Sequence, residues 1–427
     1  MPPRARVLGL ECLRCRALFD GPRLFTGCPQ CGQQGVGVNL TVKLDLESLK
    51  GRGSELFARS AAAGGLWRFG AVMPVAIEHA VTMGEGATPL IHLERLGRRL
   101  GLSRLYAKDE GQNPTWSYKD RLCSVAVTHA VETGARVITV SSTGNHGAAT
   151  AAYAARAGLP CVIFTLASVP ETMKTLMQAY GAAVVACPTS ESRWQLMRQG
   201  VERLGWYPTS GCVLPPIGSP PYGIEGYKSL AYEIVEDLGW TAPDRCVVPS
   251  GYSDGLFGIW KGMQEARTLG LVKEVPRMIA AEPYGPLTHA MEAGLDVPEP
   301  VQGDRRSVAF SVASRYGTYQ GLTALRESRG SGVQITDEGI FEAQRALARE
   351  EGIFAEPSAV TAVTAVMQLS AGKAIDPDEV VVVVLTSSGL KDPGASRAWL
   401  PEVPAAPADF DGLLVVLHES YGLALDR

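Results

Sequence analysis

Short apolar runs alternate with helical patterns through the middle of the chain. In the helical segments, apolar side chains recur every three or four residues, as they do on one face of an α-helix. The successive pairs of apolar run and helical segment are 136–142 and 146–158, 160–166 and 171–182, and 183–188 and 192–205. This alternation is typical of βαβ units, so we predict a parallel sheet covered by helices.

A cluster of proline and glycine at 213–226 interrupts the pattern, and a second alternating series follows it. The second series comprises the segments 244–251, 256–270, 277–283, 336–352 and 379–389. Because such clusters break regular structure, we interpret 213–226 as a crossing between two domains. The second series predicts a larger sheet than the first.

We therefore predict an α/β protein with two main domains. The predicted parts are an N-terminal knuckle at 1–40, a large α/β domain at 41–110 and 216–400, a small α/β domain at 111–215, and a C-terminal segment at 401–427. Residues 401–408, with three prolines, predict a short linker into that last segment. The pattern leaves the structure of the segment itself open.

Composition excludes several classes of protein. The chain has 427 residues, of which 46% are hydrophobic and 20% charged, and these values exclude wholesale disorder. The 40 Lys and Arg against 44 Asp and Glu give a net charge of -4, so the sequence indicates no nucleic-acid and no membrane partner. No apolar run reaches about 18 residues and no signal peptide is recognisable, so we expect a cytoplasmic protein.

Four of the nine cysteines form two close pairs near the N-terminus. Cys12 and Cys15 make one CxxC pair, and Cys28 and Cys31 make the next, directly before Gly32. Two such knuckles can present four thiolates to one tetrahedral zinc ion. We predict a structural zinc site here, and the alternatives are a degenerate knuckle without metal and a redox function.

Three predicted strands lead into polar turns. The turns are SSTGNHG at 141–147, SGYSDG at 250–255 and TSSGLKD at 386–392. Ligands gather at the carboxyl ends of strands in open α/β sheets, and free amides at a helix start suit a carboxylate or phosphate. Taken singly, each turn has an ordinary tight turn as its alternative.

Lys119 stands just before the apolar helix predicted at 121–134. A lysine at a helix start is disfavoured, because the positive end of the helix dipole repels a cation. That cost disappears when the amine is consumed in a Schiff base. The alternative is an exposed lysine beside Asp120.

Seven motifs occur in the order found in one enzyme family. They are GEGATPL at 84–90, NPTWSYKDR at 113–121, SSTGNHGAA at 141–149, IEGYKSLAYEI at 224–234, AEP at 281–283, EPSAV at 356–360 and TSSGLKDP at 386–393. On these motifs the chain resembles the fold-type II enzymes that depend on pyridoxal phosphate (PLP), and within them the threonine synthases. The resemblance spans roughly residues 84–395. It implies a two-domain α/β fold like that of the tryptophan synthase β subunit, with PLP bound by the large domain.

The resemblance also implies a role for each matching residue. Lys119 would bind PLP as a Schiff base and would shuttle the proton at the substrate α-carbon. The other implied cofactor contacts are Asn145 at the 3′-oxygen, Ser250, Gly251, Tyr252, Ser253, Asp254 and Gly255 at the phosphate, and Thr386 at the pyridine nitrogen. The residues implied to border the substrate are Ser117, Ser142, Thr143 and His146. A hydroxyl at the pyridine nitrogen favours elimination and replacement over transamination.

The chain departs from the usual threonine synthase pattern around Lys119 and in the phosphate loop. Where NPTGSFKDRG is usual, this chain has Trp116, Tyr118 and Leu122, which make the floor of the pocket bulkier. Asp254 lies in a loop that must bind an anion, which requires its carboxylate to turn outward.

Gly223 stands where an arginine usually precedes the IEG motif. This change removes a cation that is expected at a substrate phosphate. Three other cations could take the place of the missing arginine, namely Lys174, Lys228 and Arg315. An arginine restored at position 223 is therefore expected to favour O-phosphohomoserine.

The leading hypothesis is a threonine synthase-like, PLP-dependent lyase that acts on an amino acid by elimination or replacement, with O-phosphohomoserine as substrate. The alternative within enzymes is β-elimination or β-replacement, as in serine or threonine dehydratases and cysteine or cysteate synthases. The alternative from another class is a non-catalytic binding protein with the PLP fold, against which Lys119 and Asn145 argue. We expect a small amino-acid substrate and a homodimer.

Overall fold

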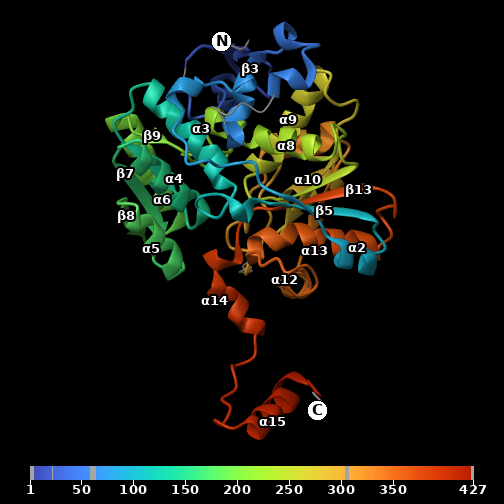
Figure 1. Ribbon diagram of the computed structural model, residues 1–427. Coiled ribbons are helices and arrows are strands. Elements are labelled where there is room, and N and C mark those ends of the chain that lie inside the picture. The colour runs from blue at the N-terminus through green and yellow to red at the C-terminus, as the bar shows by residue number, and fades with distance from the viewer. Residues whose placement is uncertain (1–3, 22, 58–63, 303–306, 425–427) are drawn as a thin grey trace.

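Three β-sheets organise the computed structural model, which describes residues 4–21, 23–57, 64–302 and 307–424 (Figure 1). The largest sheet has the strand order β12-β11-β10-β13-β5-β4. Its strands are β4 (Leu90–His92), β5 (Arg104–Asp109), β10 (Arg245–Pro249), β11 (Arg277–Glu282), β12 (Ser331–Gln334) and β13 (Val380–Leu385). All neighbouring strands are parallel except β4 and β5. The alternating pattern missed β4 and β5, which lie outside both series.

Both faces of the large sheet are buried, and β13 explains how. Val381 and Val383 point into one hydrophobic core, and Val382 and Val384 point into another, because side chains alternate along a strand. The first core is closed by α2 (Glu94–Leu100), α12 (Asp337–Glu351) and α13 (Pro357–Ala371). The second is closed by α8 (Lys228–Asp237), α9 (Asp254–Thr268) and α11 (Tyr319–Glu327), with α7 (Pro221–Ile224) and α10 (Pro286–Glu292) nearby.

The second sheet has four parallel strands in the order β8-β7-β6-β9. They are β6 (Ile138–Ser141), β7 (Cys161–Leu166), β8 (Ala183–Cys187) and β9 (Tyr207–Pro208). The helices are α3 (Lys119–Glu132), α4 (Asn145–Arg156), α5 (Glu171–Ala179) and α6 (Ser190–Leu204). The three pairs of strand and helix predicted from the first series are confirmed as β6 and α4, β7 and α5, and β8 and α6.

The N-terminal sheet has the order β2-β1-β3 and is antiparallel. Its elements are β1 (Arg6–Cys12), β2 (Leu18–Phe19) and β3 (Leu40–Asp45), with α1 (Pro29–Gln33) between the second and third strands. β3 pairs with β1 along its length, so this sheet continues past residue 40, where we predicted the knuckle to end.

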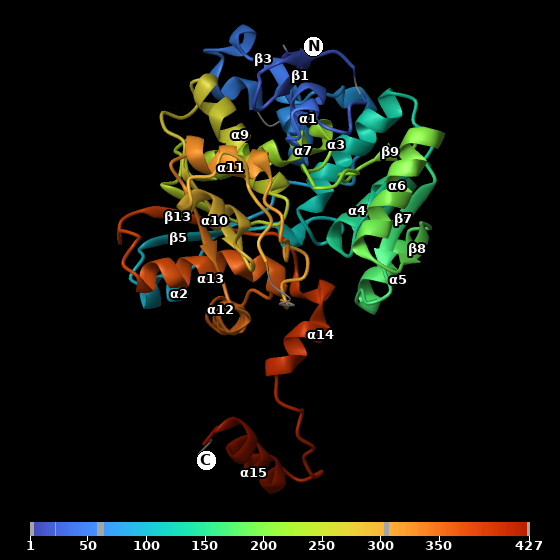
Figure 2. The same ribbon diagram turned by 180° about the vertical axis from the view of Figure 1, so that it is seen from behind.

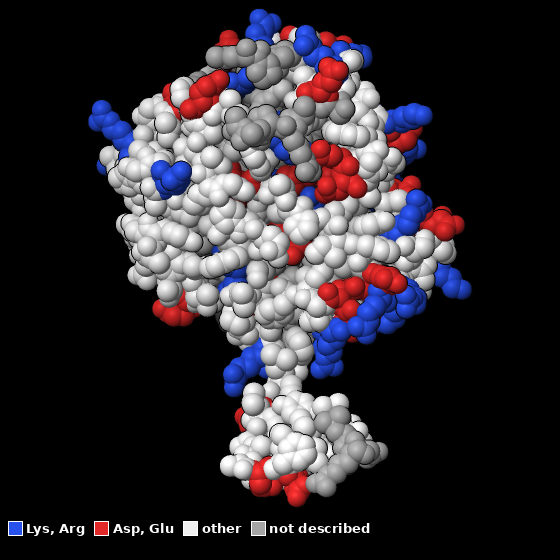
Figure 3. Space-filling model, in the orientation of Figure 1, with Lys and Arg blue, Asp and Glu red and all other residues white. Residues whose placement is uncertain are grey.

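The C-terminal segment contains α15 (Phe410–Tyr421), which follows the short α14 (Pro393–Ser396) and an extended stretch of chain. Figures 1 and 2 place α15 away from the sheets, and none of its side chains is buried. Figure 3 shows Lys and Arg interspersed with Asp and Glu over the visible face. Among the described residues, no helix is long and apolar enough to cross a membrane.

Candidate active site

A cavity of about 510 Å³ lies between the large sheet and the four-stranded sheet, at the carboxyl ends of β6, β10 and β13. Eleven of the predicted site residues line it, namely Lys119, Ser142, Thr143, Asn145, His146, Gly251, Tyr252, Ser253, Asp254, Gly255 and Thr386. Ser117 and Ser250 are not among its lining residues. Ser117 pairs in a β-bridge with Ser387, and the Ser250 amide donates to the Ala281 carbonyl at 2.9 Å.

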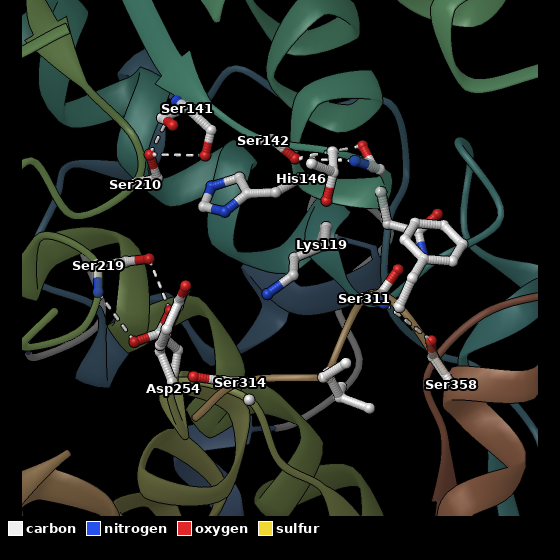
Figure 4. Close-up of a pocket in the computed structure, with 18 of the residues that line it drawn as sticks. Lys119, Ser141, Ser142, His146, Ser210, Ser219, Asp254, Ser311, Ser314 and Ser358 are labelled. Atoms are coloured by element: carbon white, nitrogen blue, oxygen red, sulfur yellow. Dashed lines mark hydrogen bonds between the residues drawn. The ribbon is translucent and has the colours of Figure 1, made fainter. Parts of the chain in front are cut away.

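Lys119 is the first residue of α3, and its side chain extends into the cavity between His146 and Asp254 (Figure 4). Its amine lies 4.8 Å from the centre of the Tyr118 ring. The neighbouring Asp120 carboxylate is engaged by Thr115, whose amide donates at 2.7 Å and whose hydroxyl donates at 2.5 Å. The helix start is thus arranged so that Asp120 turns inward and Lys119 turns to the cavity, and the alternative of an exposed pair does not hold.

The Ser142 side chain stabilises the turn after β6. Its hydroxyl accepts hydrogen bonds from the Gly144 amide at 3.1 Å and the Gly147 amide at 3.0 Å. Amides in the first turn of α4, from Asn145, have no partners within the helix and face the same region. Burial, and then the Lys119 amine, holds the pKa of His146 well below its usual range, so this ring is neutral at pH 7.

Asn145 and Glu356 meet on the wall of the cavity. The Asn145 Nδ2 donates to Glu356 Oε1 at 2.8 Å. Asn145 Oδ1 and Glu356 Oε2 are both buried and have no hydrogen-bond partner among the described residues. Burial raises the pKa of Glu356 to about 7, although the nearby Lys391 opposes the shift. The pair therefore carries unused hydrogen-bonding capacity inside the cavity.

The loop after β10 leads into the start of α9, with Ser253 in the left-handed region at φ 64°. The carboxylate of Asp254 accepts from the Ser219 amide at 2.9 Å, the Ser219 hydroxyl at 2.6 Å and Gln320 Nε2 at 2.8 Å. These three donors hold both carboxylate oxygens of Asp254, as Figure 4 shows for Ser219. The loop amides can therefore bind an anion despite the acidic residue beside them.

Two charged residues of the cavity were not predicted from the sequence. Glu356 begins the EPSAV motif but received no role, and Arg193 was one arginine in a helical pattern. Arg193 lies in the first turn of α6, is 7% exposed and lines the cavity. The one feature of the sequence that could have indicated its burial is its position next to Trp194, and both residues are buried in α6.

Position 223, where the threonine synthase pattern has an arginine, has no room for a larger side chain. Gly223 is buried in α7, and a Cβ on it would lie 3.2 Å from side-chain atoms of Leu122 and Ala126. Lys174 pairs with Glu171 at 2.8 Å. The fully buried Lys228 and the residue Arg315 do not line the cavity either. None of the three proposed substitutes therefore stands at the site.

The four N-terminal cysteines come together at the tips of their knuckles. Their sulfur atoms all lie within 4.8 Å of one another. Cys12 Sγ is 3.7 Å from Cys31 Sγ, and Cys15 Sγ is 3.6 Å from Cys28 Sγ. Four thiolates at about 2.3 Å from one ion would lie about 3.8 Å apart, so the cluster has the dimensions of a tetrahedral zinc site.

Comparisons with known proteins agree with this arrangement. The family described as pyridoxal-phosphate dependent enzyme matches residues 81–387. A threonine synthase of Methanocaldococcus jannaschii is 34% identical over 419 residues, which are 96% of this chain and 99% of that protein. A threonine synthase of Mycobacterium tuberculosis is 33% identical over 350 residues, which are 81% of this chain and 91% of that protein.

Solved structures share the fold at lower identity. The crystal structure of O-ureido-L-serine synthase has a TM-score of 0.60 and 22% identity, and the match covers 74% of this chain and 94% of that one. Threonine deaminase isoform 2 of Solanum lycopersicum has a TM-score of 0.60 and 20% identity, over 70% of this chain and 79% of that one. The family match and the near full-length relatives show that the chain belongs to the fold-type II, pyridoxal-phosphate-dependent enzymes and is a threonine synthase-like lyase.

Proposed function

We propose that the enzyme converts O-phosphohomoserine and water to threonine and inorganic phosphate. The observation that carries this proposal is the place of Lys119 in a cavity that also holds the starts of α4 and α9. An amine at that place can hold the cofactor covalently and exchange protons with a substrate. The two helix starts supply amides for two anions, the phosphate of the cofactor and the carboxylate of the substrate.

The groups around the cavity fit PLP. The loop 250–255 offers amides at a helix start to the phosphate, and Ser219 draws the Asp254 carboxylate aside. Asn145, with its unpartnered Oδ1, is a polar neighbour for the ring oxygen. Thr386, at the end of β13, is a hydroxyl for the pyridine nitrogen. These residues would hold the cofactor through its phosphate, its ring oxygen and its ring nitrogen.

Bound PLP supplies an electron sink for the bonds at the substrate α-carbon. The Lys119 amine removes the proton from that carbon and later returns protons to the substrate. Ser142 shapes the turn whose amides hold the substrate carboxylate, which fixes the α-carbon within reach of Lys119. The neutral His146 ring, with an unpartnered Nε2, can make one hydrogen bond to substrate without adding charge.

Two aromatic rings support the lysine. Its amine lies 4.8 Å from the centre of the Tyr118 ring and 5.5 Å from that of Tyr227. Ring faces attract a cation and exclude water, so they restrict the amine to the cavity side. Tyr118 also touches the phosphate loop, since a Cβ on Gly255 would lie 2.6 Å from its ring. Glycine at 255 therefore allows the ring to lie against the loop.

A second candidate function is β-elimination or β-replacement on serine, threonine or an O-substituted serine. The observation in its favour is the packing of Gly223 against Leu122, which closes position 223 to an arginine side chain. A small or uncharged leaving group needs no such cation.

The products distinguish the two functions. The purified enzyme is to be incubated with O-phosphohomoserine, serine, threonine and O-acetylserine in turn. Threonine and inorganic phosphate in equal amounts from O-phosphohomoserine are the expected result. Keto acid from serine or threonine, with no threonine from O-phosphohomoserine, would support the second candidate and contradict the first.

The N-terminal cysteine cluster is proposed to bind one structural zinc ion. The four sulfurs fit a tetrahedron, and a site of four thiolates leaves no position open for a substrate. We also propose, from the sequence, that the enzyme is a homodimer and works in the cytoplasm. Light scattering during size-exclusion chromatography tests the first of these two, and microscopy of a tagged chain tests the second.

A further inference from the structure

Arg193 is a buried cation for which the described part of the chain provides no ionic partner. It is 7% exposed, and its Nε is buried with no hydrogen-bond partner among the described residues. Across the described ranges, no Asp or Glu forms an ion pair with it. A buried charge of this kind is costly unless an anion compensates it. Two other buried arginines show the usual arrangement, since Arg121 forms ion pairs with Glu110 and Glu233 and Arg245 forms one with Glu379.

The anion has to come from a ligand, because among the described residues neither acid that lines the cavity, Asp254 or Glu356, forms an ion pair with Arg193. Asp254 accepts three hydrogen bonds from Ser219 and Gln320, and Glu356 accepts one from Asn145. Two ligand anions have places at the starts of α4 and α9, as described above. Arg193 stands on a third element, α6, so it is free for a third anion.

The surroundings of Arg193 favour an anion on the substrate side chain. Trp194 lies next to it, and its ring meets the Tyr252 ring edge-on with 6.0 Å between centres. This contact joins the start of α6 to the loop 250–255. Ser168 and Ser190 also line the cavity and offer hydroxyl donors. A cation with hydroxyls around it is the donor set that a phosphate dianion requires.

We infer that Arg193 is a specificity-determining residue that binds the phosphate leaving group of the substrate, an inference that rests on the proposed function. In the reaction the Cγ–O bond of O-phosphohomoserine breaks, and its electron pair leaves with the phosphate. Water supplies the hydroxyl that appears at Cβ, so the substrate and water together account for threonine and phosphate. The guanidinium offsets the charge on the departing group and selects substrates that carry it.

The test compares Arg193→Gln and Arg193→Lys with a matched control, Arg198→Gln. Arg198 lies on the same helix but pairs with Glu202 on the surface. The probes are 2-amino-5-phosphonopentanoate, in which a methylene replaces the ester oxygen of the substrate, and 2-aminopentanoate, which lacks the anion. Calorimetry of the holoenzyme gives the affinity for each probe, and PLP released after dialysis gives cofactor retention.

We expect Arg193→Gln to weaken binding of the phosphonate by about 10- to 100-fold, with Arg193→Lys in between. Affinity for 2-aminopentanoate, cofactor retention and the Arg198→Gln control should not change. Equal losses for both probes would make Arg193 merely structural, and a loss of PLP alone would assign it to the cofactor phosphate. Either result, or an unchanged phosphonate affinity, overturns the inference. If the wild type makes no threonine but binds the phosphonate in an Arg193-dependent way, the proposed function fails and the anion site stands.

Discussion

Gly223 and Leu122 pack directly against each other, although they lie on different helices. A Cβ on Gly223 would lie 3.2 Å from Leu122 Cγ, closer than side chains normally pack. Both positions depart from the usual threonine synthase pattern, which has arginine at the first and glycine at the second. The two departures are therefore one complementary exchange, in which the leucine side chain fills space that the glycine leaves.

This packing reverses our sequence-based expectation for Gly223→Arg. We now expect the variant to be destabilised by about 1–3 kcal/mol or more, because the long side chain must enter the packed face of α3. The double variant Leu122→Gly, Gly223→Arg should recover part of that loss, and Gly223→Ala should cost less. Thermal unfolding of the three variants checks this. Wild-type stability in Gly223→Arg would mean that the arginine finds another route to the cavity.

Lys119→Ala should abolish turnover and leave the fold intact, since the side chain points into a cavity rather than into the core. Borohydride treatment of the wild type should fix the cofactor on Lys119, as mapped by mass spectrometry. Circular dichroism of the variant is the control for folding. A label on a different lysine, or turnover by the variant, would contradict the assignment.

The double variant Cys12→Ser, Cys28→Ser should lose its zinc, because it retains only one thiol from each knuckle. Metal analysis should find one equivalent in the wild type and in the control Cys161→Ser, a cysteine of β7 outside the cluster. The PLP absorbance of the double variant should persist. Full zinc content in that variant would exclude this ligand set.

Glu356 should make stability depend on pH. Folding raises the pKa of its carboxyl from an ordinary value near 4.5 to about 7. Between these two values the folded chain keeps a proton that the unfolded chain has released, so this group lowers stability as pH rises. The difference in unfolding free energy between Glu356→Gln and wild type should therefore shift in favour of the variant by about 1–3 kcal/mol as pH rises from 5 to 7.

Urea denaturation at pH 5 and pH 7 measures this difference. The control is Glu342→Gln, which changes an exposed carboxylate on α12. An equal stability difference at both pH values for Glu356→Gln would show that this carboxyl titrates normally.

The local sequence determined the elements and the turns of the candidate site. Alternation of apolar runs and helical periods is a property of neighbouring residues, so it predicted β6 through α6 and placed 141–147 and 250–255 at strand ends. Strands β4 and β5 lie outside both alternating series, and β5 joins the sheet by pairing with β13, which comes from far along the chain.

Contacts between distant residues decided the rest. The direction of the Asp254 carboxylate depends on Ser219 and Gln320, which lie 35 and 66 residues away. The closure of position 223 depends on Leu122, and the isolation of Arg193 depends on which face of α6 meets the cavity. A sequence lists charges without showing whether they are paired, because pairing and burial arise only when separate elements pack together. The sequence by itself therefore determined the family and the place of the chemistry, and only the tertiary structure decided which charged groups are left for the substrate.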